Sequence, residues 1–107
     1  MKPILILISG FSCTGKTTLA NKISKRYSLP LIARDEIKES LYNSLGYSDR
    51  EWSRKLGIAS YDLLYLLMDK LLANNQSLIT ESNFKLTTDT AKLLNFQSKY
   101  KFYLLQI

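Results

Sequence analysis

Residues 10–17 read Gly-Phe-Ser-Cys-Thr-Gly-Lys-Thr, which matches the phosphate-binding pattern G-x-x-x-x-G-K-[ST] in full. Gly10 and Gly15 let the backbone turn so that successive N–H groups point at one phosphate, an approach that a Cβ would obstruct. Lys16 supplies a compact cation for the β- and γ-phosphates, and the Thr17 hydroxyl can complete the coordination of Mg²⁺. The motif restricts the chain to folds in which a strand leads into a helix through a tight turn.

The segments on both sides of the loop agree with this interpretation. Residues 4–8 are all Ile or Leu, which is typical of a strand covered on both faces. Downstream, a helix is predicted over 16–27 from apolar residues at helical spacing, namely Leu19, Ala20, Ile23 and Tyr27. The start of this helix adds the positive end of its dipole to the phosphate site. The alternative is an ordinary strand-to-helix turn that happens to hold two glycines, and the agreement of strand, loop and helix argues against it.

The rest of the chain continues the alternation of strands and helices. Strands are predicted at 3–9, 30–33, 77–80 and 101–107, and helices at 16–27, 36–45, about 48–75 and 87–96. The long helix opens on a capping-box pattern at 48–51, and Gly57 is a point at which it can bend. Its apolar stripe (Tyr61, Leu64, Met68, Leu71 and Leu72) predicts core packing. This order predicts one α/β domain over residues 1–107, with a parallel sheet flanked by helices.

Composition excludes several classes of protein. The chain has one cysteine and no histidine, which excludes an internal disulfide framework and histidine-dependent catalytic or zinc sites. No apolar run is long enough to span a membrane. We therefore expect a cytoplasmic protein without membrane partners.

The net charge of +6 admits a nucleic-acid partner but does not favour one. Lys22, Lys25 and Arg26 cluster near the end of the first predicted helix, where a basic surface could attract phosphate. Cations are also favoured there by the helix dipole, and no aromatic interleaving or recognition motif accompanies them. We favour a solvated helix face.

Acidic and polar residues follow the second and third predicted strands, at the edge where ligands bind in parallel sheets. Asp35 follows the second strand and is the candidate general base, because a carboxylate can orient and deprotonate an acceptor hydroxyl. It could equally be the N-cap of the helix predicted from Glu36. Arg34 could clamp a substrate phosphate or be a surface charge.

Glu81 ends the third predicted strand, where it could hold Mg²⁺ together with Thr17, contact substrate, or be a surface acid. Asn83 is a candidate substrate contact two residues further on. Cys13 lies inside the phosphate loop, either as a thiol of lowered pKa or as a small residue that the loop tolerates.

The chain resembles the small P-loop kinases in three features taken together: the motif, the short strand that ends in Arg34-Asp35, and the strand that ends in Glu81. The nearest branch contains zeta toxins, chloramphenicol phosphotransferase, polynucleotide 5′-hydroxyl kinases and AAA-domain kinases. The resemblance implies a three-layer P-loop NTPase fold with sheet order 2-3-1-4-5, and ATP with Mg²⁺ as the phosphoryl donor. Asp35 matches the catalytic aspartate of that group, and Thr18 matches the residue whose hydroxyl meets the α-phosphate. The expected nucleotide site is the whole loop, namely Gly10, Phe11, Ser12, Cys13, Thr14, Gly15, Lys16, Thr17 and Thr18.

The sequence departs from that group toward its end. Such kinases continue past the fourth strand with an arginine-bearing lid, whereas no arginine follows Arg54 here. We therefore expect a chain that is incomplete at the C-terminus relative to these kinases. The leading hypothesis is a kinase that transfers the ATP γ-phosphate to a hydroxyl of a small molecule or nucleotide. The alternative is a nucleotide-binding module without useful catalysis. A GTPase is disfavoured because the base-reading and switch motifs are absent.

Overall fold

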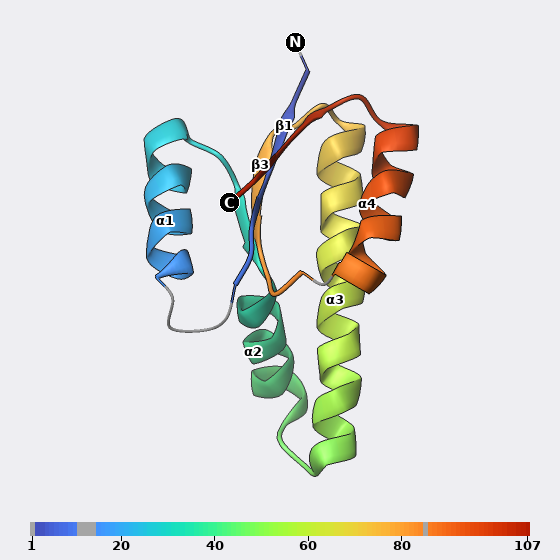
Figure 1. Ribbon diagram of the computed structural model, residues 1–107. Coiled ribbons are helices and arrows are strands. Elements are labelled where there is room, and N and C mark those ends of the chain that lie inside the picture. Colours follow the sequence, from blue (N-terminus) through green and yellow to red (C-terminus); the bar gives the residue numbers. More distant parts are fainter. Residues whose placement is uncertain (1, 11–14, 85) are drawn as a thin grey trace.

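The computed structural model describes residues 2–10, 15–84 and 86–107, and within them strands and helices alternate as predicted (Figure 1). In chain order the elements are β1 (Ile4–Ile8), α1 (Lys16–Tyr27), β2 (Leu31–Ala33), α2 (Arg34–Leu45), α3 (Arg50–Ala73), β3 (Leu78–Glu81), α4 (Leu86–Lys99) and β4 (Tyr103–Gln106). The described helices include none that is both long enough and apolar enough to cross a bilayer.

The four described strands form one parallel sheet in the order β2-β3-β1-β4. This agrees with the first four positions of the order implied by the resemblance. β3 lies between β1 and β2, and Glu81 at its end is in register with Ile8 of β1 and Ala33 of β2. The carboxyl ends of these three strands therefore meet at one edge of the sheet.

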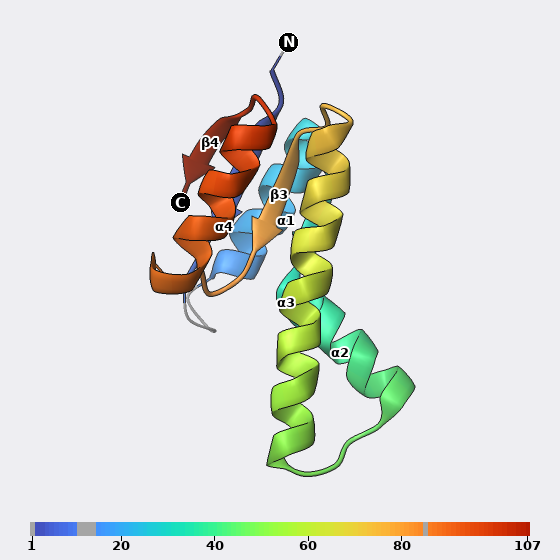
Figure 2. The ribbon, with the colours of Figure 1, turned by 90° about the vertical axis from the view of Figure 1, so that its right-hand side faces the viewer.

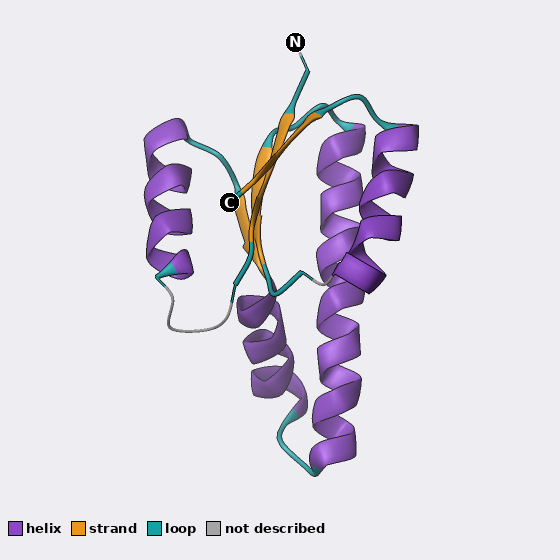
Figure 3. Ribbon diagram, viewed as in Figure 1, coloured by secondary structure: helices purple, strands orange, loops and turns teal. Residues whose placement is uncertain are grey.

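Helices cover both faces of the sheet and make three layers (Figure 3): α1 lies on one side, and α3 and α4 lie on the other. The two-residue period of β1 supplies both cores. Leu5 and Leu7 belong to the cluster formed with α3 and α4, whereas Ile6 and Ile8 belong to the cluster formed with α1. Burial of each such side chain contributes about 1.5–3 kcal/mol, so a strand that is apolar at every position is what a central strand requires.

The apolar stripe of α3 packs as predicted. Leu64, Met68 and Leu72 are buried in the core, with Tyr61 and Leu71 packed against them. The helix runs unbroken from Arg50 to Ala73, so Gly57 does not interrupt it. A glycine costs about 1 kcal/mol in a helix interior, which the buried stripe outweighs.

The start of α2 shows that one of the two roles expected for Asp35, that of helix N-cap, is wrong. The helix begins at Arg34 rather than Glu36, its N-cap is Ala33 in extended conformation, and no side chain caps it. Asp35 therefore lies inside the first turn and is not the N-cap.

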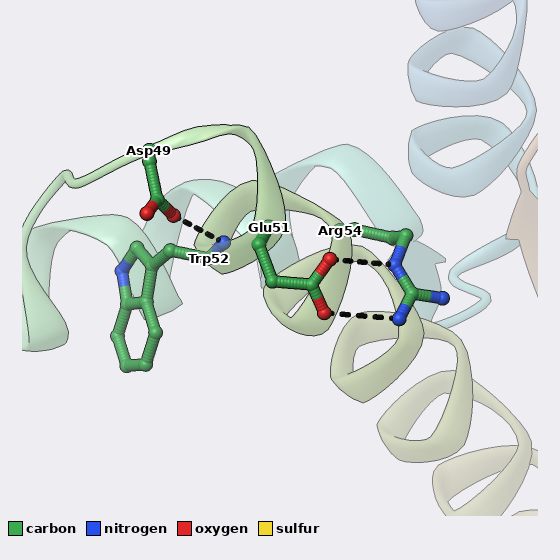
Figure 4. Close-up of polar contacts among 4 residues, drawn as sticks. All are labelled: Asp49, Glu51, Trp52 and Arg54. Carbon is green, nitrogen blue, oxygen red and sulfur yellow. Dashed lines mark hydrogen bonds and ion pairs between the residues drawn. The ribbon is translucent and has the colours of Figure 1, made fainter.

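The start of α3 lies one residue later than the capping-box pattern indicates. Asp49, not Ser48, is the N-cap, and its carboxylate accepts a hydrogen bond of 2.9 Å from the Trp52 backbone N–H (Figure 4). Glu51 forms an ion pair with Arg54 instead of reaching back to the cap.

α2 and the first half of α3 project together beyond the carboxyl edge of the sheet (Figures 1 and 2). We call this helical pair, residues 34–61, the α2–α3 arm. Its tip is held by the Trp52 indole, which donates to the Gly46 carbonyl at 3.0 Å, and by a hydrogen bond between the Tyr42 and Ser53 hydroxyls. The near end of the arm adjoins the ends of β1, β2 and β3.

Candidate functional site

Both motif glycines adopt positive φ, a backbone region that favours glycine. Gly10 follows β1 with φ 145°, and Gly15 precedes α1 with φ 79°. Within the described part of the chain a Cβ at Gly15 would meet no atom within 4 Å, and its positive φ is a conformation that favours glycine. The predicted loop residues between them, Phe11, Ser12, Cys13 and Thr14, lie outside the described residues.

Lys16 is the first residue of α1, and its side chain contacts the residue that follows β1 and Ser9. Its ammonium donates to the Gly10 carbonyl at 2.5 Å. Gly15, the N-cap of α1, has no side chain to cap the helix, and the first turn holds no acidic residue. Thr18 lies exposed in this turn. The loop ends thus bring together a cation and the N–H groups of a helix N-terminus, a combination that suits a phosphate.

Thr17 and Glu81 meet across the edge of the sheet. The Thr17 hydroxyl donates to the Glu81 carboxylate at 2.6 Å, although the residues are 64 positions apart in the sequence. Glu81 is only 5% exposed, so its carboxylate is held among protein groups. A hydroxyl and a carboxylate are hard oxygen ligands of the kind that Mg²⁺ takes. The two side chains therefore fit the metal partner that the fold implies.

Next to Glu81, the Ser82 hydroxyl is buried and, among the described residues, has no hydrogen-bond partner. Sequence reasoning did not single it out, because a serine after a strand carries no specific signal. It adds an unsatisfied polar group to this edge of the sheet, and such groups are uncommon in folded proteins.

Asp35 lies at the same edge. It follows Ala33 by two residues, as Gly10 follows Ile8, and both strands end level with Glu81. Its side chain is exposed and makes no hydrogen bond or ion pair with the described part of the chain. The carboxylate is therefore available to a ligand bound at this edge.

Arg34 packs against α3. Its Nε donates to the Ser60 hydroxyl at 3.0 Å, its Nη2 donates to the Gly57 carbonyl at 3.4 Å, and its guanidinium lies 4.1 Å from the centre of the Tyr61 ring. Ser60 is fully buried. These contacts fasten the start of α2, and hence the neighbouring Asp35, to α3.

Sequence reasoning missed the partners of Arg34. The available signal was Gly57, because a glycine inside a helix often marks a close approach by another group. A Cβ added at Gly57 would lie 3.1 Å from the Arg34 Nη2.

Asn83 is exposed in the loop after β3, and its backbone carbonyl accepts a hydrogen bond of 3.3 Å from the Tyr61 hydroxyl. In the same loop, the Phe84 N–H donates to the Ser9 hydroxyl at 3.1 Å, which joins it to the end of β1. The loop that carries Asn83 is thus fixed to both the end of β1 and the α2–α3 arm.

Comparison with known proteins gives one family match. The family model described as zeta toxin matches residues 1–106. A candidate kinase from Chloroflexus aurantiacus j-10-fl has a similar crystal structure, with a TM-score of 0.93 and 40% sequence identity. That match covers 98% of this chain and 58% of the other, so this chain spans somewhat more than half the length of that relative. Among curated proteins no match was found.

Two more distant structures share the fold. The Pnkp1/Rnl/Hen1 complex contains a chain with a TM-score of 0.66 and 15% identity, covering 99% of this chain and 37% of that one. The PezAT chromosomal toxin–antitoxin system of Streptococcus pneumoniae contains a chain with a TM-score of 0.65 and 20% identity, covering 98% of this chain and 47% of that one. At these identities the similarity extends to the three-layer α/β architecture and no further.

Proposed function

The chain belongs to the zeta toxin family, and from that premise we propose that it is a phosphotransferase that moves the γ-phosphoryl group of ATP to a hydroxyl of a small molecule or nucleotide. The observation that carries this proposal is the contact of the Thr17 hydroxyl with the buried Glu81 carboxylate, at the N-terminal end of the helix whose first residue is Lys16. The domain concerned is residues 1–107.

Residues 10–18 would bind the donor. Backbone N–H groups of this loop would surround a phosphate, Lys16 would contact the β- and γ-phosphates, and Thr18 would contact the α-phosphate. Thr17 and Glu81 would hold Mg²⁺. When bound, Mg²⁺ offsets negative charge on the phosphate oxygens during transfer.

Asp35 would orient the acceptor and remove its proton. The acceptor oxygen forms a bond to the γ-phosphorus while the bond from this phosphorus to the β–γ bridging oxygen breaks, and ADP leaves with that electron pair. The hydroxyl proton passes to the Asp35 carboxylate. The exposure of Asp35 at the sheet edge supports this role. Arg34, through N–H groups not bound to α3, and Asn83 are proposed acceptor contacts.

Two measurements with matched variants test the proposal. Mg²⁺ with ATP should raise the melting temperature of the protein, and Lys16→Ala should abolish the rise because the loop loses its cation. Transfer from γ-labelled ATP to a panel of hydroxyl acceptors should be lost in Asp35→Asn. Glu39→Gln is the control, because Glu39 is an exposed acid one turn further along α2.

The outcomes separate catalysis from binding alone. Transfer that survives in Asp35→Asn would remove the proposed base. Nucleotide-dependent stabilisation without transfer to any acceptor would favour a nucleotide-binding module. Stabilisation that is unchanged in Lys16→Ala would remove the nucleotide site itself.

A further inference from the structure

Ser60 occupies a position of α3 that faces the protein interior. Its side chain has no exposed surface, and the residues four positions before and after it, Leu56 and Leu64, are buried apolar side chains. A buried hydroxyl costs stability unless it is hydrogen-bonded, and alanine suits a helix interior better than serine does. The stability of α3 by itself therefore does not account for a serine here.

Both hydrogen bonds of the Ser60 hydroxyl help to hold one guanidinium. The hydroxyl donates to the Gly57 carbonyl at 2.6 Å and accepts from the Arg34 Nε at 3.0 Å. Because its single proton is engaged by Gly57, its oxygen is left to act as an acceptor for Arg34. The Arg34 Nη2 also donates to the Gly57 carbonyl, at 3.4 Å. Ser60 thus holds one edge of the Arg34 guanidinium against α3.

Tyr61, the next residue of α3, holds the face of the same guanidinium. The centre of its ring lies 4.1 Å from the Arg34 guanidinium, which is within the range of a cation–π contact. Its hydroxyl donates to the Asn83 carbonyl at 3.3 Å. One side chain therefore contacts both the start of α2 and the loop after β3.

The hold on Arg34 matters because the start of α2 is otherwise weakly fastened. Ala33 is the N-cap, and no side chain caps the helix. Within the described first turn, Arg34 is the residue whose side chain makes hydrogen bonds. A helix start without a cap leaves its N–H groups unsatisfied and is prone to fray. The position of Asp35, which is exposed in this turn, therefore depends on the contacts of Arg34 with α3 (Figure 2).

Transfer to a hydroxyl is sensitive to such a position. The base has to lie within hydrogen-bond reach of the acceptor hydroxyl, and a displacement of about 1 Å can lower a rate about a hundredfold. Resting on the phosphotransfer function proposed above, we infer that Ser60 and Tyr61 are positioning residues. They fix Arg34 against α3 and thereby set the place of Asp35 relative to the loop that carries Asn83. Both act through Arg34 and not by contact with ATP.

Small substitutions on α3 test the inference. Ser60→Ala removes one oxygen and leaves a good helix former, and we expect kcat to fall about ten- to hundredfold while the KM for ATP is unchanged. Tyr61→Leu, which removes the ring, should have the same effect. Tyr61→Phe keeps the ring and should retain kcat within about threefold. Ser53→Ala is the matched control and should leave kcat unchanged, because the Ser53 hydroxyl also joins α3 to α2, through Tyr42 at the tip of the arm.

Two further measurements show whether the effect passes through Arg34. In an Arg34→Ala background, Ser60→Ala should cause no additional loss of kcat, because the guanidinium that it holds is gone. Trypsin cleavage after Arg34, followed by mass spectrometry, reports the same contacts without any transfer. The side chain must leave α3 before the protease can bind it, so Ser60→Ala should be cut there about tenfold faster. Ser53→Ala should be cut at the original rate.

The outcomes separate this inference from the proposed function. If the unaltered chain transfers phosphate, an unchanged kcat in Ser60→Ala, an equal loss in Ser53→Ala, or a further loss on top of Arg34→Ala would each overturn the positioning role alone. Absence of transfer by the unaltered chain to every acceptor would refute the phosphotransferase and, with it, a role in transfer. Equal trypsin cleavage with and without Ser60→Ala would refute the hold of Ser60 on Arg34 in either case.

Discussion

Replacing Gly57 by alanine adds a methyl group where α3 passes the guanidinium of Arg34. The new Cβ would lie 3.1 Å from the Arg34 Nη2, so the guanidinium has to shift by a few tenths of an ångström. Its bond to the Gly57 carbonyl is already 3.4 Å long and would be lost first. Its 3.0 Å bond to Ser60 can lengthen and persist.

Two effects of similar size then oppose each other. Alanine favours a helix interior over glycine by about 0.8–1 kcal/mol. Loss of the long, partly exposed hydrogen bond costs about 0.5–1 kcal/mol. We therefore expect Gly57→Ala to leave the free energy of unfolding within about 0.5 kcal/mol of the original chain. In an Arg34→Ala background nothing obstructs the methyl group, so the same change should stabilise by about 1 kcal/mol.

The assay is a double-mutant cycle of Gly57→Ala and Arg34→Ala, with urea unfolding followed by circular dichroism. A coupling of about 0.5–1 kcal/mol is expected. Lys38→Ala is the matched control, because its Nζ would lie 3.9 Å from the new Cβ, an ordinary contact. If Gly57→Ala changed stability equally in all three backgrounds, the close approach of Arg34 to α3 would be refuted.

Three further predictions concern other parts of the chain. Asp49→Ala should lower the free energy of unfolding by about 1 kcal/mol through loss of the α3 cap, whereas Asp49→Asn should retain most of the stability. If urea unfolding showed equal losses for both variants, the cap contact would not be the source of the stability. Leu64→Ala truncates a fully buried side chain and should lower the free energy of unfolding by about 2–5 kcal/mol. A shift in the urea midpoint equivalent to less than about 1 kcal/mol would contradict the place of Leu64 in the core. Burial, with a hydrogen bond to Asp89, raises the pKa of Tyr65 above its usual 10.0. Unfolded Tyr65 therefore ionises near pH 10 while the folded side chain stays protonated, so stability should fall as the pH rises past about 10. Tyr65→Phe should reduce this slope, measured as urea midpoints between about pH 9 and 11, and an unchanged slope would contradict the assignment.

Local signals predicted the elements around the phosphate loop well. The apolar run over residues 4–8 forms β1, and α1 has the bounds predicted from its apolar spacing. Parallel strand ends share one edge, so the sequence also indicated that Thr17 and Glu81 could lie close together. Their contact in the structure agrees, while the binding of Mg²⁺ there stays a prediction.

Signals that depend on distant partners were not visible. Ala33 offers no capping side chain, and the first turn of α2 is instead held through Arg34 by Ser60, which lies 26 residues later. A groove between α2 and α3, which Arg34, Lys38, Arg50 and Arg54 line, likewise depends on the way in which the two helices come together. Lys38 and Arg50 appear in the sequence as ordinary exposed charges, and only the packing of α2 on α3 places them across one groove.

The central place of β1 affects how the molecule is made. Among the four described strands β1 is synthesised first, yet both of its neighbours, β3 and β4, are synthesised much later. At about 5–20 residues per second, the last neighbour emerges roughly 5–20 s after it. Until β3 emerges, this strand of five aliphatic residues lacks both of its neighbours, and its other edge stays unpaired until β4 follows, so the nascent chain is open to aggregation or chaperone capture over this interval.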